Sequence, residues 1–153
     1  SYYVYRRTNN GAWKRRAVLS ASSNSYIDRN VKQGKKYTYK VRAYNNGIFG
    51  RFSSEKKVYR LKKLTNIRVK NTSGRRAAVL WKKKTYATTY QVKYAANPSF
   101  NKARKVSANK KNSRLTTKKL KKKTYYFQIR YSYKKGGVKS WSAWSKVKKI
   151  KIR

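Results

Sequence analysis

The stretch that decides the fold runs from Tyr26 to Tyr44 and reads YIDRNVKQGKKYTYKVRAY. Its second half alternates between apolar or aromatic residues and polar ones, which is the period of a β-strand with one buried and one solvated face. The side chains expected to face inward are Tyr37, Tyr39, Val41 and Ala43, and those expected to face outward are Thr38, Lys40 and Arg42. Gly34 lies in the preceding turn, where we expect a positive φ angle.

This pattern recurs later in the chain. Leu115, Leu120 and the run YYFQIRY over residues 125–131 repeat it, and Tyr125 follows Tyr37 by 88 residues. Working outward, a VLW run ends at Trp81, and a YQV run begins at Tyr90.

These residues resemble the fibronectin type III family, in the form common in bacterial extracellular proteins. The resemblance implies an all-β fold of tandem immunoglobulin-like sandwiches, with Trp81 as the buried Trp of strand B. It also implies that Tyr37 and Tyr125 are tyrosine corners, whose hydroxyls bond to the backbone just upstream. The residues that carry it are Tyr26, Asp28, Val31, Gly34, Tyr37, Tyr39, Val41, Ala43, Val79, Leu80, Trp81, Tyr90, Gln91 and Val92.

The resemblance divides the chain into residues 1–60, a partial module that lacks strands A and B, and residues 61–153, a complete module. Residues 2–6 align with residues 90–94 as strand C, which predicts that Tyr2 and Val4 face inward and that Tyr3 and Tyr5 face outward. Tyr26 is expected to open strand E. A sandwich without two strands exposes core and sheet edges. We therefore expect these strands to come from the preceding chain or from a neighbouring molecule by strand addition.

In residues 61–153 the predicted strands are A over 63–70, B over 77–81, C over 89–95, a strand at Leu115, F from Tyr125 and G through Val147 to Ile152. The side chains expected to be buried are Trp81, Tyr90, Val92, Phe127 and Ile129.

Charge dominates the composition. Among 153 residues, Lys and Arg number 45, Asp and Glu only two, and the formal net charge is +43. Ordinary surfaces mix both signs. A solubility device would explain a basic surface, but the size of this excess favours a polyanionic partner.

The residues for catalysis or metal binding are almost absent. The chain has no His and no Cys, and its only carboxylates are Asp28 and Glu55. General acid–base sites, zinc sites and calcium sites need more of these groups. We expect no enzyme activity, no cofactor and no metal. Asp28 is expected to form an Asx-type turn, and Glu55 is expected to be a solvated charge.

The sequence Trp141-Ser-Ala-Trp144-Ser145 matches the Trp-Ser-X-Trp-Ser box of cytokine-receptor modules with this same fold. In that family the indoles stack with basic side chains of the neighbouring strand. The resemblance therefore implies a structural role for Trp141 and Trp144, with Arg130 as their expected cation–π partner. A carbohydrate-stacking or receptor role is the alternative.

The outward strand faces are where partners are expected to bind, because basic residues neutralise phosphate or carboxylate groups and aromatic residues stack on sugars or bases. A solvated strand face explains any one of these residues, but not the whole excess. The candidate polyanion-binding residues are Tyr3, Tyr5, Lys40, Arg42, Lys93, Tyr126, Arg130, Lys148 and Lys151.

The sequence thus predicts a non-catalytic adhesion and spacer module of a bacterial surface or secreted protein. Its expected partners are anionic polymers such as wall teichoic acid, acidic glycans or host mucin, and its expected location is the cell surface. One alternative is binding of nucleic acid, including extracellular DNA. Another is a structural subunit of an extracellular filament, with strands supplied by a neighbour. No apolar run reaches the roughly 18 residues of a membrane span.

Overall fold

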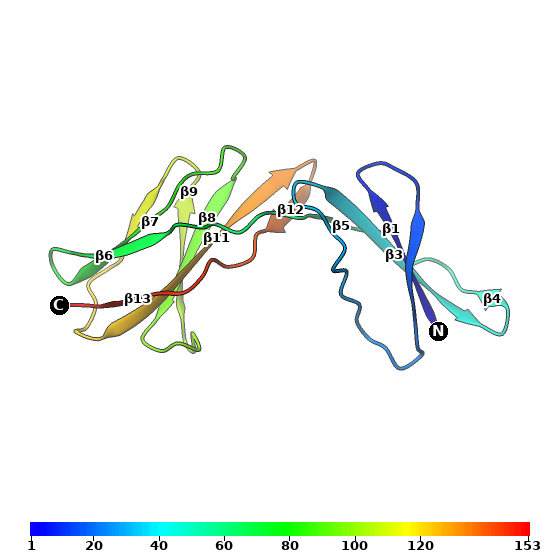
Figure 1. Ribbon diagram of the computed structural model, residues 1–153, viewed down its shortest axis with the longest axis horizontal. Helices are drawn as coiled ribbons and strands as arrows, with labels where there is room; N and C mark the ends of the chain where they lie inside the picture. The colour runs from blue at the N-terminus through cyan, green and yellow to red at the C-terminus, as the bar shows by residue number, and fades with distance from the viewer. The chain divides into compact units, whose positions relative to one another are not determined.

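The computed structural model describes residues 1–153 and contains only strands, turns and loops, as the sequence predicts for an all-β chain. It divides into two compact units, Ser1–Arg60 and Leu61–Arg153, which are described one at a time (Figure 1). The chain contains no helix that could span a membrane.

Unit 1 is a single antiparallel sheet with the strand order β2-β1-β3-β4, in which β5 also pairs with β3. Its strands are β1 (Tyr2–Thr8), β2 (Lys14–Leu19), β3 (Lys36–Asn45), β4 (Ile48–Phe49) and β5 (Lys56–Tyr59). The long strand β3 is the predicted alternating strand, and it pairs with β1 on one side and β5 on the other.

The turns before and after β3 contain positive φ angles at Gly and Asn residues, which adopt them most readily. Gly34 has φ = 78°, as predicted for the turn before the strand. Asn46 and Gly47 have φ values of 44° and 84° and join β3 to β4. Two successive positive φ angles define a type I′ turn, whose twist matches that of the strands it connects.

The strand predicted to begin at Tyr26 does not form, and residues 20–35 contain no strand at all. In unit 2 the corresponding strand, β10 (Arg114–Thr116), pairs with β7 (Arg76–Leu80), and unit 1 has no strand in the place of β7. Without that partner, the backbone of this segment has no ladder to join. Ile27 consequently leaves 69% of its surface exposed.

Three predicted side-chain positions in unit 1 are wrong. Tyr2 is 38% exposed and Ala43 is exposed, although Val4 beside them is buried. Tyr2 and Ala43 pair with each other near the end of the sheet, where no second sheet covers them. Thr38, predicted to face solvent, is fully buried because it lies between the longer side chains of Arg7 and Lys57 on the two neighbouring strands.

Unit 2 has two antiparallel sheets. The first has the order β10-β7-β6, with β6 at Arg68–Thr72. The second has the order β12-β11-β8-β9, and β13 also pairs with β11. Its strands are β8 (Thr89–Ala95), β9 (Arg104–Asn109), β11 (Thr124–Lys135), β12 (Val138–Trp141) and β13 (Lys148–Lys151). The sequence placed β8 at its observed bounds.

The core of unit 2 contains the side chains that the sequence predicts. Trp81 is 5% exposed, and Tyr90, Val92, Phe127 and Ile129 are fully buried. The rings of Trp81 and Tyr90 lie 5.1 Å apart. The buried hydroxyl of Tyr90 accepts a 2.8 Å hydrogen bond from the backbone N–H of Lys84, which satisfies its polar atom inside the core.

Candidate polyanion-binding faces

The four candidate residues of unit 1 share one face of its sheet. The register pairs Tyr3 with Arg42 and Tyr5 with Lys40 across β1 and β3. Side chains that are paired directly across two strands point to the same side. The guanidinium of Arg42 also donates a 2.8 Å hydrogen bond to the hydroxyl of Tyr5.

Aromatic rings that the sequence analysis did not select lie between these cations. The ammonium of Lys40 is 4.2 Å from the ring centre of Trp13 and 4.0 Å from that of Phe52. The guanidinium carbon of Arg42 is 3.7 Å from the ring centre of Phe49 and 4.6 Å from that of Phe52. We call Trp13, Lys40, Phe52, Arg42 and Phe49 the first ladder, in which cations and rings alternate.

Unit 2 carries a similar arrangement around its Trp-Ser box. The guanidinium carbon of Arg130 is 4.3 Å from the ring centre of Trp141 and 4.4 Å from that of Trp144, which confirms the predicted partner. Lys139 covers the other end at Trp141, at 4.8 Å, and Lys93 lies 4.4 Å from Trp144. We call Lys139, Trp141, Arg130, Trp144 and Lys93 the second ladder. At its far end, Lys93 also contacts Phe100, at 4.5 Å.

The two serines of the Trp-Ser box hold the second ladder against β11. Ser145 donates its N–H to the carbonyl of Ile129 at 2.9 Å, and its hydroxyl accepts from the N–H of Ile129 at 3.0 Å. Ser142 makes the same pair of bonds to Tyr131, at 2.9 and 3.1 Å. The serine hydroxyls thereby replace a pairing strand at these two positions.

The segment Phe49-Gly-Arg-Phe52-Ser53 repeats this construction in unit 1. Ser53 donates its N–H to the carbonyl of Val41 at 2.8 Å and accepts from the N–H of Val41 at 3.0 Å. Phe49 and Phe52 have the same spacing as Trp141 and Trp144. This spacing of aromatic, two residues, aromatic, Ser is the signal that would have revealed the first ladder.

Two cations of the second ladder, Arg130 and Lys93, are partly removed from water. Burial lowers the pKa of Arg130. Burial also lowers the pKa of Lys93, and the nearby charges of Lys105 and Arg130 lower it further. The hydrogen bonds of Arg130 go to the neutral oxygen of Gln91, at 2.9 and 2.8 Å. An anion bound at this face would offset the repulsion between these cations and compensate for their lost hydration.

The remaining three candidates of unit 2 are not members of the second ladder. Tyr126 is half-buried and pairs with Ala95, on the same side of the sheet as Arg130. Lys151 pairs with Thr124 and belongs to that side too. Lys148 was predicted to lie on the same outward face but pairs with Phe127, so it is on the opposite side. A one-residue difference in register reverses the side that a strand residue faces.

Both carboxylates of the chain are engaged within unit 1. Asp28 lies 2.7 Å from Arg6, and both side chains are largely buried. Glu55 is exposed, as predicted for a solvated charge, and it also pairs with Arg7 at 3.2 Å. This second pair was missed because it joins residues 48 positions apart, which only the fold brings together.

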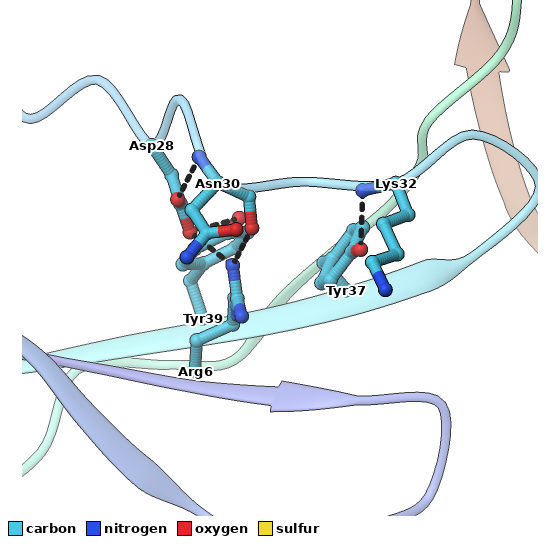
Figure 2. A network of polar contacts seen from close by, with 6 residues as sticks. All are labelled: Arg6, Asp28, Asn30, Lys32, Tyr37 and Tyr39. Atoms are coloured by element: carbon cyan, nitrogen blue, oxygen red, sulfur yellow. Dashed lines mark hydrogen bonds and ion pairs between the residues drawn. The ribbon is translucent and has the colours of Figure 1, made fainter.

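Asp28 is the centre of a polar network (Figure 2). It accepts hydrogen bonds from Arg6, from the hydroxyl of Tyr39 at 3.0 Å and from the N–H of Asn30 at 3.0 Å, and the last of these forms the predicted Asx-type turn. Burial alone would raise the pKa of Asp28, but these bonds hold that pKa below its ordinary value. Burial, followed by the bond to Asp28, raises the pKa of Tyr39 to about 12.

The two predicted tyrosine corners differ. The hydroxyl of Tyr37 accepts a 2.7 Å hydrogen bond from the backbone N–H of Lys32, five residues upstream, as Figure 2 shows. Tyr125 makes no such bond, and its ring instead lies 6.5 Å from that of Tyr94. Its turn from Leu120 is one residue shorter than the turn from Val31 to Tyr37, which changes the reach of the hydroxyl.

The structure brings together no group of three His, Cys, Asp or Glu side chains that could hold a metal ion. The chemistry that the two ladders offer is binding of anions and of flat or apolar ring faces. They present cations beside aromatic rings, and the carboxylate nearest to them, Glu55, is paired with Arg7, whose guanidinium lies over Trp13.

No protein-family model and no curated protein match the sequence. Solved structures do match. A two-domain fibronectin type III segment of chicken tenascin is 18% identical, with a TM-score of 0.52 over 99% of this chain and 83% of that chain. A cytokine receptor complex is 15% identical, with a TM-score of 0.53 over 99% of this chain and 86% of that chain.

A chicken CNTN1 segment of domains FN1–FN3 is 21% identical with a TM-score of 0.49, and this chain spans 53% of it. The tenascin and cytokine-receptor likenesses, together with the sheets described above, show that this chain has the all-β fold of tandem fibronectin type III domains.

Proposed function

We propose that this chain is a non-catalytic adhesion and spacer module of a bacterial surface or secreted protein, and that it binds anionic polymers. The polymer is held along the faces that carry the first and second ladders. Wall teichoic acid, acidic glycans and mucin are the expected partners.

The observation that carries this proposal is the absence of carboxylates from both ladders. The chain has 45 basic and two acidic side chains, and the two acidic ones are paired with Arg6 and Arg7. The ladder cations Lys40, Arg42 and Arg130 therefore have rings and neutral oxygens as neighbours, and no counter-charge within the chain. A polymer with many anionic groups would supply that counter-charge.

The aromatic members of the ladders support a polymer ligand over isolated ions. Phe49 and Phe52 are 42% and 39% exposed and flank Arg42. Cations already lie over these rings, so their exposed parts offer apolar contact to a polymer beside the charges that neutralise phosphate, sulfate or carboxylate groups. The same contacts hold the cations in a fixed row, which lowers the conformational entropy lost when a polymer binds.

The absence of catalytic groups also supports a binding role. Asp28 and Glu55 are held in ion pairs on separate parts of unit 1, and the chain has no His or Cys. The titratable acid beside Asp28 is the hydroxyl of Tyr39, whose pKa is raised to about 12, far above the near-neutral range in which general acid–base catalysis works best.

Titration of the whole chain with four polymers tests this function. Teichoic acid, a sulfated glycan, mucin and duplex DNA would be compared at about 0.15 M salt, where exposed charges further apart than about 8 Å are screened. Saturable binding of the wall polymer or the glycans supports the proposal. Preference for DNA would favour the nucleic-acid alternative, and binding of none of the four would contradict both.

A second candidate function is a structural subunit of an extracellular filament. It is favoured by the face of unit 1 that no second sheet covers, where Tyr2 is 38% and Val58 is 42% exposed. Strands donated by a neighbouring molecule or by preceding chain would bury this face. Sedimentation over a range of protein concentrations tests it, because donation between copies predicts concentration-dependent assembly that Val58→Asp abolishes.

A further inference from the structure

A cavity of about 310 Å3 opens on unit 1 between β1, β2 and the turn that joins them. We call it the basic pocket, and its lining residues are Arg6, Thr8, Gly11, Ala12, Lys14 and Arg16. It lies on the opposite side of the sheet from the first ladder. Arg6 pairs with Lys14 and Tyr39, whereas Lys40 of the ladder pairs with Tyr5, the neighbour of Arg6 in β1.

A β-bulge gives the pocket one of its cations. The register between β1 and β2 shifts between Val4 and Tyr5, where Ala17 and Arg15 are the successive partners and Arg16 is left unpaired. A bulge of this kind redirects side chains, and bulges occur often beside binding sites. Arg16 therefore lines the pocket together with Lys14, two residues before it.

The charges of the pocket are incompletely balanced. Arg6 has Asp28 as its partner, but Lys14 and Arg16 have no carboxylate, since the only other one pairs with Arg7. The Nε atom of Arg16 is buried and has no hydrogen-bond partner. A buried donor without a partner is costly, and a bound anion would satisfy it.

Arg6 also keeps donors for a ligand. Its hydrogen bonds to Asp28 and to the carbonyl of Asn30, both 2.7 Å long, leave from the same atom, Nη1 (Figure 2). A guanidinium has five N–H donors in a planar fork, which matches the oxygen geometry of phosphate and sulfate. The fixed contacts with Asp28 and Asn30 orient this fork before any ligand arrives.

The position in unit 2 that corresponds to Arg6 is occupied by an aromatic residue of the core. Tyr94 pairs with Phe127 in unit 2 as Arg6 pairs with Tyr39 in unit 1. Tyr94 is 4% exposed and stacks on Phe127 at 5.4 Å. Replacing such a ring by an arginine costs desolvation that only its partners offset. A position that departs from the core pattern in this way is where a functional site is expected.

We propose that the basic pocket binds one tetrahedral oxyanion, namely a phosphate or sulfate group. Lys14 and Arg16 neutralise it, the free donors of Arg6 bind its oxygens, and the hydroxyl of Thr8 is a further donor. The volume is about ten times the 30 Å3 that one water occupies in the liquid, so it admits the anion together with part of an ester substituent. This site uses none of the ladder residues and stands apart from the proposed function.

The test is an NMR titration of the amide signals of the whole chain with inorganic phosphate and then sulfate, against sodium chloride at matched ionic strength. We expect saturable shifts confined to the amides of residues 6–16. The double variant Lys14→Gln/Arg16→Gln is expected to lose about tenfold or more in phosphate affinity, because two charge-assisted contacts are lost. Lys14 is exposed and Arg16 is half-buried, and the dispersion of the spectrum shows whether the variant is folded.

The matched control is Lys56→Gln/Lys57→Gln, which removes the same charge from exposed positions of β5 in the same unit. It is expected to retain phosphate affinity within about twofold. Absence of saturable shifts at matched ionic strength would overturn the proposal, and so would equal losses in the two double variants. Free phosphate and sulfate are the probes, so the result does not depend on whether the ladders bind polymers.

Discussion

Arg6 and Asp28 form the most buried ion pair of the chain, with Nη1 of the arginine 2.7 Å from Oδ2 of the aspartate. The pair fastens the strandless segment 20–35 to β1. Removing the carboxylate leaves a largely buried guanidinium without a counter-charge, so Asp28→Ala is expected to destabilise unit 1 by about 3–5 kcal/mol. Denaturant unfolding measures this, with Glu55→Ala as the control. That exposed pair is expected to contribute about 1 kcal/mol or less.

The carboxylate of Asp28 makes the stability of unit 1 depend on pH in the acid range. The pKa of Asp28 is lowered in the folded state, so its stabilisation is complete above the ordinary aspartate pKa of 3.8 and is lost as the pH falls through the lower folded value. Stability measured from about pH 6 down to pH 2 is therefore expected to fall below about pH 4. Asp28→Asn should flatten this fall, and an unchanged profile would show that Asp28 does not cause it.

Trp81 holds the two sheets of unit 2 together and is 5% exposed. Trp81→Ala is expected to cost about 3–5 kcal/mol, which would unfold a marginally stable unit. Circular dichroism and thermal unfolding check this prediction. Val147→Ala is the control, since Val147 is 44% exposed and its truncation is expected to change stability by about 0.5 kcal/mol or less.

The second ladder is expected to stabilise unit 2 modestly. Arg130 contacts two indole rings, and each cation–π contact contributes on the order of 0.5–2 kcal/mol. Arg130→Gln should therefore destabilise unit 2 measurably and change the fluorescence of Trp141 and Trp144. Arg104→Gln, at an exposed position of β9, should do neither. Identical stability of the two variants would contradict this role of the ladder.

The two units are expected to unfold separately, unit 1 first. Unit 1 is one sheet that leaves Ile27 69% exposed, whereas unit 2 packs two sheets around fully buried rings such as Tyr90 and Phe127. Hydrogen exchange should show weaker protection across β1 and β3 than across β8 and β11. Equal protection in both units would contradict this expectation.

The parts of the fold that depend on local alternation could be predicted from the sequence. The strands β3, β8 and β11 are visible because each alternates over six or more residues, and Trp81 and Tyr90 are buried as their pattern predicts. The errors arose where a residue needs a partner elsewhere. The segment at Tyr26 has a strand pattern but no strand beside it, and Tyr2 has a core pattern but no facing sheet.

The candidate site was predictable in most of its cations and in the two indole rings of the second ladder, but not in the rings of the first ladder. Arg130 and its Trp-Ser box were identified because the box is local in sequence. Phe49 and Phe52 were missed, although their spacing before Ser53 matches that of the box, because phenylalanines replace the tryptophans; the hydrogen bonds of Ser53 to Val41 show the same construction. The basic pocket was missed entirely, because it depends on a β-bulge at Arg16 that no sequence pattern marks.

The measurement that tests the central claim most directly is the salt dependence of teichoic acid binding by the whole chain and two variants. The ladder variant is Lys40→Gln/Arg42→Gln/Lys93→Gln/Arg130→Gln, and the control removes the same charge at the exposed Lys56, Lys63, Lys110 and Lys111. Counterion release predicts that affinity falls linearly with salt on a log–log scale, with a slope near −0.9 per phosphate contact for duplex DNA and a similar trend for other polyphosphates.

We predict saturable binding at about 0.15 M salt, a ladder variant that loses most of the affinity, and a control variant that loses only a small share. No binding at that salt concentration, or equal losses in the two variants, would contradict the claim that the ladder faces bind anionic polymers.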